Sequence, residues 1–175
     1  LFLAERPAGK AGSVVTCTLN GTRPLLVEVQ ALVAPTGYGT ARRTAIGVDT
    51  NRVALLAAVL EKKEDIPLVG CDIFVNVAGG MTLNEPACDL AVCAALVSSL
   101  QNRPLDPHTL VLGEVGLAGE VRGVAQAEAR LAEAARLGFA RAVIPSGNAR
   151  HAAVPAGIEV EGVDTVAEAL DRLFP

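Results

Sequence analysis

The sequence lacks the motifs by which proteins most often bind nucleotides and metals. It contains no G-x-x-x-x-G-K-[ST] run, and no G-x-G-x-x-G leads from a predicted strand into a helix. The four cysteines and two histidines form neither a C-x-x-C pair nor the spacing of zinc ligands. We therefore expect no nucleotide or metal cofactor within these 175 residues. Free thiols of this kind are typical of a reduced, cytoplasmic protein.

Long apolar runs are also missing. No stretch reaches the roughly 20 apolar residues that a membrane-spanning helix needs, and no charged-then-apolar signal segment opens the chain. We expect no membrane as a partner. The only methionine is Met81 and the chain begins at Leu1, so we expect a fragment of a longer protein.

The composition is that of a folded domain. Hydrophobic residues make up 51% of the chain and charged residues 19%, which excludes intrinsic disorder. A chain of this length can bury one substantial core. The net charge is −4, so any contact with nucleic acid must come from a local basic patch rather than from the overall field.

The order of predicted elements indicates the fold class. Alternating β-branched residues predict strands over 13–20, 24–34, 42–48, 71–78, 109–116, 119–124, 141–145 and 158–163. The first two strands are expected to form a hairpin, and so are 109–116 and 119–124. Helical spacing predicts helices over 51–64, 86–101, 125–137 and 166–174, the last opened by a capping box at Thr165. This order predicts an α/β (α+β) sandwich whose mixed sheet combines hairpins with crossover helices.

One junction has the layout of a functional site. The stretch VNVAGGMTLNEPACDLAV (75–92) reads as a buried strand, a glycine hinge and a helix that begins near Pro86. A helix start beyond a strand end presents unpaired backbone N–H groups, which suits catalysis or anion binding.

Three stretches together carry a family resemblance. They are 75–92, VLGEVGLAGEVRGV (111–124) and EARLAEAARLGFARAVIPSGN (128–148). In order and spacing they resemble the proteolytic domain of Lon-type proteases, and more closely the Lon-like C-terminal domain of RadA-type bacterial DNA repair proteins. The opening LFLAERP and the segments 21–33 and 42–56 are similar to RadA as well, so the resemblance covers nearly the whole chain.

The resemblance implies a domain layout and a set of partners. Residues 1–12 would connect to a missing ATPase domain, and 13–175 would form the Lon-like domain. The parent would be a DNA-dependent ATPase that binds ATP, magnesium and zinc outside this fragment. It would form a hexameric ring, process recombination intermediates on DNA by branch migration, and work beside a RecA-type recombinase.

The resemblance also places the protease dyad. The serine of Lon proteases falls on Ala87 and the lysine base on Glu128, so neither catalytic group is present. Glu85 and Asp89 stand where the protease has small residues, and we expect them to crowd and acidify the pocket in which an oxyanion must form. We expect this domain to be proteolytically inactive.

Two alternatives stay open. Cys88 at the helix start could serve a cysteine peptidase or amidase, although the neighbouring acids and the lack of an adjacent histidine favour a packed, inert thiol. The domain could also serve oligomerisation alone.

Four arginines are the candidate DNA-binding residues. Arg42 and Arg43, with Arg52 close behind, can meet DNA phosphates or carboxylates of a neighbouring subunit, or simply form a solvated strand edge. Arg122 can contact phosphate or pair with Glu128 or Asp89. The arginines of the segment 130–141 are expected on an ordinary exposed helix surface.

Overall fold

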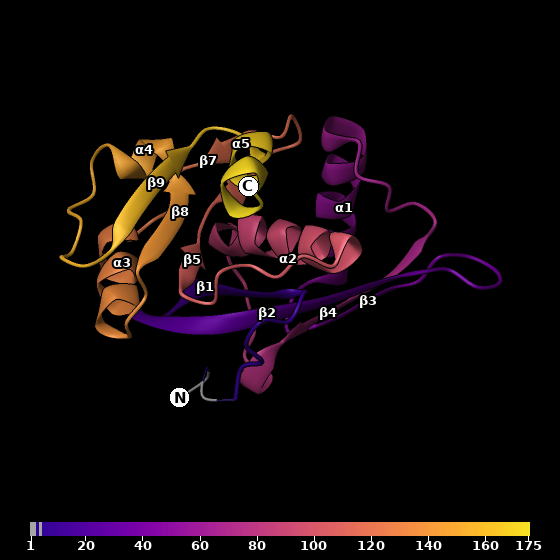
Figure 1. Ribbon diagram of the computed structural model, residues 1–175, viewed down its shortest axis with the longest axis horizontal. Coiled ribbons are helices and arrows are strands. Elements are labelled where there is room, and N and C mark those ends of the chain that lie inside the picture. Colours follow the sequence, from indigo (N-terminus) through magenta and orange to yellow (C-terminus); the bar gives the residue numbers. More distant parts are fainter. Residues whose placement is uncertain (1–2, 4) are drawn as a thin grey trace.

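The computed structural model describes residue 3 and residues 5–175. The predicted connecting segment 1–12 and the opening LFLAERP therefore lie partly outside the described residues. Seven strands form one mixed sheet in the order β3-β4-β2-β1-β5-β8-β9 (Figure 1). The strands of this sheet are β1 (Ser13–Asn20), β2 (Arg23–Pro35), β3 (Arg43–Ile46), β4 (Cys71–Val77), β5 (Thr109–Val111), β8 (Arg141–Pro145) and β9 (Glu159–Val163).

The sheet joins an antiparallel part to a parallel part. β1 pairs with β2 and β2 with β4 in antiparallel fashion. β3 runs parallel to β4, and β5, β8 and β9 continue from β1 as parallel neighbours. Parallel neighbours require crossover connections, which the helices supply. The predicted mixed sheet with a hairpin and crossovers is therefore confirmed.

The helices occupy both faces of the sheet. They are α1 (Thr50–Glu64), α2 (Asp89–Gln101), α3 (Ala127–Arg136), α4 (Ser146–Ala149) and α5 (Val166–Leu173), with short 3-10 turns η1 (Ala78–Gly80) and η2 (Pro86–Cys88). Helix α2 lies between the sheet and α5, with α1 beside it (Figure 1). Every residue from Asp89 to Ser98 is buried, which explains why this helix is apolar on all sides.

Two hydrophobic cores result from the alternation of side chains along β1. Val14 points into the larger core, which α1, α2 and α5 cover. Val15 and Cys17 point to the opposite face, into a smaller core closed by Leu131 of α3. Successive strand residues face opposite sides, so one strand serves both cores.

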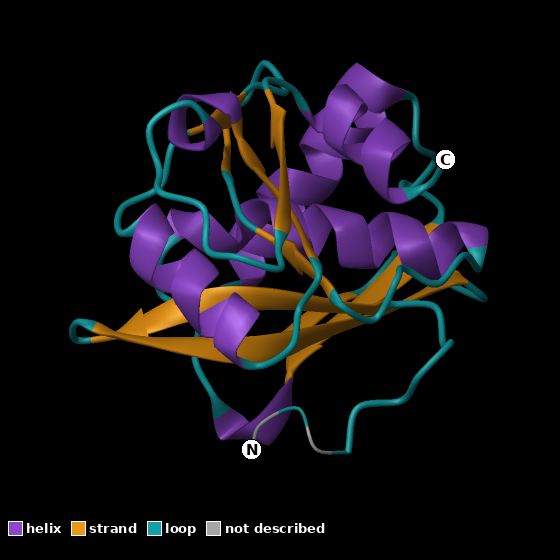
Figure 2. Cartoon of the chain, turned by 60° about the vertical axis from the view of Figure 1, so that its left-hand side comes forward, coloured by secondary structure: helices purple, strands orange, loops and turns teal. Residues whose placement is uncertain are grey.

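Part of the sheet is left uncovered. On the side of the sheet away from α1 and α2, helix α3 packs against β1 and part of β2. Beside β4 and β3 on that side, Figure 2 shows η1 and the N-terminal segment. Leu32 and Ile46 are exposed on these strands. We call this surface the outer face.

Three local predictions need comment. Only Thr109–Val111 of the predicted strand 109–116 joins the main sheet, and the second hairpin is the short pair β6 (Glu114–Val115) and β7 (Val121–Arg122). The capping box is confirmed, since the Thr165 hydroxyl accepts from the Glu168 N–H at 3.1 Å. Helix α4 was not predicted, because four residues are too short for a helical pattern.

Candidate functional site: the junction between β4 and α2

The glycine hinge allows a sharp turn after β4. Gly79 and Gly80 have φ of 76° and 71°, in the left-handed region that other residues rarely adopt. The chain then returns beside Gly47, whose carbonyl accepts from the Leu83 N–H at 2.7 Å. A proline at the first position of η2 opens the helical segment, as the sequence predicted.

Ala87 lies buried in the first turn. Its carbonyl accepts from the Gly113 N–H at 2.8 Å, and the Gly113 carbonyl accepts in turn from the Leu90 N–H at 3.0 Å. A Cβ atom at Gly113 would lie 2.8 Å from Val121, so only glycine permits this close approach. Ala87, on which the resemblance places the protease serine, is therefore joined to the β5–β6 connection by backbone hydrogen bonds.

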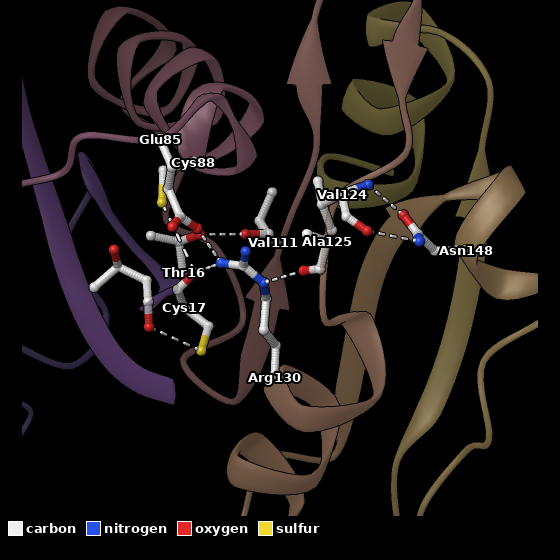
Figure 3. A network of polar contacts seen from close by, with 10 residues as sticks. Thr16, Cys17, Glu85, Cys88, Val111, Val124, Ala125, Arg130 and Asn148 are labelled. Carbon is white, nitrogen blue, oxygen red and sulfur yellow. Dashed lines mark hydrogen bonds and ion pairs between the residues drawn. The ribbon is translucent and has the colours of Figure 1, made fainter. Parts of the chain in front are cut away.

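A buried arginine faces the same turn from helix α3. Arg130 has only 2% of its side chain exposed, and it forms an ion pair with Glu85 (Figure 3). It also donates to the carbonyl oxygens of Cys17 at 2.7 Å and Ala125 at 2.9 Å. The expectation that Arg130 belongs to an ordinary exposed surface was wrong. Its guanidinium joins β1, the segment before α3 and the start of η2, because each of them supplies an acceptor.

A second arginine compensates the other acid. Asp89 is buried and accepts from Arg52 of α1 through both carboxylate oxygens, and from the Val115 N–H at 3.0 Å. This hydrogen bonding raises the pKa of Arg52. The sequence predicted an acidified pocket, but each of the two carboxylates faces a guanidinium, so their charges are largely neutralised. The two ion pairs fasten the junction to α1 and to α3.

Glu128, on which the resemblance places the protease lysine, lies elsewhere. Its side chain is exposed on α3 and accepts from the Ala153 N–H at 2.9 Å. It borders a shallow hollow together with Asn148 and His151. The cavity at the junction, of about 310 Å³, is lined instead by Val48, Asp49, Arg52, Leu83, Asn84, Glu85, Pro86, Cys88, Asp89 and Val92.

Cys88 is buried with the rest of the turn. Burial raises its pKa to about 12, and the thiol donates to the Cys17 carbonyl over 3.8 Å. A nucleophilic thiolate requires the opposite shift. Neither histidine is among the residues that line its cavity. The surroundings of Cys88 are those of an inert packed thiol.

The four candidate arginines are not gathered in one place. Arg42 keeps 72% of its side chain exposed while contacting Asp72 at 3.4 Å, and Arg43 donates to backbone carbonyls of Cys71 and Leu68. Arg52 is committed to Asp89, as described. DNA contact by these residues stays a prediction.

Arg122 lies on β7, away from β3. It pairs with Glu120, two residues earlier, rather than with Glu128 or Asp89 as the sequence suggested. Because the pair is exposed, its guanidinium remains accessible to a phosphate.

Two further observations on the described residues concern a metal ion and a bilayer. No group of three or more His, Cys, Asp or Glu side chains among them has an arrangement that fits a metal ion. No helix among them has the length and apolarity to cross a bilayer.

Comparison with known proteins agrees with the motifs. The family model described as subunit ChlI of Mg-chelatase matches residues 40–148, which is more than half of the chain. DNA repair proteins RadA are similar over nearly the whole chain: 50% identity over 171 residues in Halalkalibacterium halodurans, 52% over 170 in Bacillus subtilis and 46% over 175 in Listeria monocytogenes.

These alignments cover 98%, 97% and 100% of this chain but only 37%, 37% and 38% of the relatives. The chain thus spans less than two fifths of the length of the curated relatives it matches. It belongs to the family of the ChlI model, has a Lon-like fold and is homologous to DNA repair proteins RadA.

Proposed function

We propose that this chain is a proteolytically inactive Lon-like domain that forms a hexameric scaffold and contacts DNA within a RadA-type repair ATPase. The observation that carries the proposal is the similarity to DNA repair proteins RadA along nearly the whole chain. The parent would use ATP to process recombination intermediates by branch migration in the cytoplasm, beside a RecA-type recombinase. ATP, magnesium and zinc would bind to parts of the parent outside these residues.

The structure of the junction supports the loss of proteolysis. Ala87 offers no nucleophilic atom, and Glu128 lies in a different hollow from the one beside Cys88 and Asp89. The alternative nucleophile, Cys88, is buried and has a raised pKa. The guanidinium groups of Arg52 and Arg130, which could otherwise attract an oxyanion, are paired with Asp89 and Glu85. The junction then serves to connect α1, α2 and α3.

Arg42 is the strongest of the proposed DNA contacts. Its guanidinium is mostly exposed, and Arg42 directly precedes β3, an edge strand of the sheet. A phosphate can displace the long 3.4 Å contact with Asp72, because that carboxylate keeps hydrogen bonds from the Arg42 N–H and the Thr36 hydroxyl.

The experiment combines DNA binding with sedimentation. Arg42→Ala should weaken binding of a labelled oligonucleotide and lower the salt dependence, since one phosphate contact fewer releases fewer counterions. Arg136→Ala is the matched control, because Arg136 has 66% exposure, the same charge and one carboxylate partner. Adding Arg43→Ala should weaken binding further while leaving the circular dichroism unchanged.

Two results would contradict the proposal. A chain that stays monomeric in sedimentation velocity at high concentration argues against the scaffold. Equal DNA binding by Arg42→Ala, Arg136→Ala and the unaltered chain argues against Arg42 as a DNA contact. If Arg42→Ala instead disrupts the ring, the arginine belongs to a subunit interface.

A further inference from the structure

The only tyrosine of the chain projects from a loop between β2 and β3. Tyr38 lies between Gly37 and Gly39, and its side chain is fully exposed. Tyrosine normally buries its ring and keeps only the hydroxyl in water. A ring with this exposure is available to a planar partner. We call residues 36–42 the Tyr38 loop.

The base of the Tyr38 loop is closed by one carboxylate. Asp72 Oδ1 accepts from the Thr36 hydroxyl at 3.1 Å and from the Arg42 N–H at 2.8 Å, so it joins the first and last residues of the loop. The Thr36 N–H donates to the Gly70 carbonyl at 2.9 Å. The hydrogen bond from the Arg42 N–H is the main cause of a lowered pKa of Asp72. A closed base limits the entropy lost when the apex binds a ligand.

The charge around the loop suits an anion. From Thr36 to Val48 the sequence contains Arg42 and Arg43 but no Asp or Glu, in a chain of net charge −4. Asp72, which joins the two ends of the loop, is buried and accepts from three hydrogen-bond donors. A partner with negative charge can therefore approach Tyr38 without facing an exposed carboxylate of this segment.

An uncharged hollow lies on the outer face, and its lining includes Phe74, which the Arg42 guanidinium approaches. It has a volume of about 370 Å³, and the strand residues that line it include Gln30, Leu32, Thr44, Ile46, Phe74 and Asn76. Arg42 connects the two features, because its guanidinium lies 5.9 Å from the centre of the Phe74 ring. Apolar and amide side chains beside an arginine present a surface for bases next to a contact for phosphate.

We propose that Tyr38 stacks on an unpaired base of single-stranded DNA while Arg42 contacts the adjoining phosphate. The inference rests on the proposed DNA-binding function and specifies its ligand as a single strand. Bases in a duplex are stacked on each other, so a lone aromatic ring at a loop apex has access to them only where the strands are separated.

The sequence offers a direct optical test. The chain has no tryptophan and one tyrosine, so its tyrosine emission comes from Tyr38 alone. Titration with oligothymidine should quench this emission. A strand of abasic deoxyribose phosphates should bind through its charges without quenching. Duplex DNA should quench less than the single strand at equal occupancy.

Substitutions complete the test. Tyr38→Ala should weaken binding of fluorescein-labelled oligothymidine by roughly 5- to 150-fold, the range expected for one base–aromatic stack. Tyr38→Phe should bind like the unaltered chain, since it keeps the ring. Leu117→Ala, at another exposed loop apex, is the matched control and should leave binding unchanged.

The outcomes separate the two proposals. If the unaltered chain binds no DNA, the proposed function fails and the inference fails with it. If it binds DNA but Tyr38→Ala binds equally well and emission is not quenched, only the inference is overturned. If Tyr38→Ala reduces the size of the assembly in sedimentation, the ring packs against a second copy of the chain, and the inference is likewise overturned.

Discussion

Replacing Arg130 by alanine should strongly destabilise the domain. The side chain is 2% exposed and donates to Glu85 and to two backbone carbonyls. Removing one partner of a buried ion pair costs about 3–5 kcal/mol, because the remaining groups lose their compensation. Glu85 is 25% exposed and can recover some hydration, so we expect a loss near the lower limit, about 3 kcal/mol.

Urea unfolding followed by circular dichroism measures this loss. With a slope of about 2 kcal/mol/M, the midpoint should fall by about 1.5 M. Arg136→Ala is the control on the same helix, since its ion pair with Glu133 is exposed, and its midpoint should hardly move. Arg130→Met keeps the apolar stem and should still lose most of the stability. Equal midpoints for Arg130→Ala and Arg136→Ala would refute the structural role of the buried pair.

Three further predictions follow from the described contacts. Native protein at pH 8 should be alkylated at the partly exposed Cys71 well before Cys88, whose pKa is raised to about 12, and mass spectrometry of the labelled peptides will show the order. The lowered pKa of Asp72 means that its contribution to stability is complete above the ordinary value of about 3.9 and is lost as the pH falls through the lowered one. The NMR resonance of the Arg42 amide should shift as Asp72 is protonated, with a midpoint below about pH 3.9. A midpoint above that pH would contradict the hydrogen bonds by which Asp72 closes the loop. Asp89→Asn should cost about 1–3 kcal/mol in urea unfolding, because a charged partner of Arg52 is lost inside the junction.

The fold could be predicted from periodicity. Alternation defined β1 and β2 within a residue or two, and the apolar stretch after Pro86 predicted the helix that the structure shows buried on all sides. Strand β6 was merged with β5, because a change of sheet within the segment 109–116 leaves no break in the apolar pattern.

The side-chain partners at the junction could not be predicted in the same way. Glu85 and Asp89 were recognised as unusual, but their partners lie 45 and 37 positions away in the sequence. One signal was present for Arg130: with Ala127, Leu131 and Ala134 it follows the i, i+3, i+4, i+7 spacing of the buried face of α3. An arginine at such a position indicates a buried acceptor.

The resemblance to the Lon-like domains drew attention to Ala87 and Glu128 but implied nothing about the outer face. The sequence did not indicate a role for Tyr38, because Gly-Tyr-Gly has the ordinary composition of a turn. The full exposure of Tyr38 and the hydrogen bonds to Asp72 that close its loop are properties of the three-dimensional structure.

The central claim, that this domain contacts DNA rather than cleaving peptides, is tested most directly by a salt series of DNA binding. Fluorescence anisotropy with labelled oligothymidine should give a binding constant whose logarithm falls linearly with the logarithm of salt concentration. A folded chain that leaves the anisotropy unchanged at low salt would contradict the account.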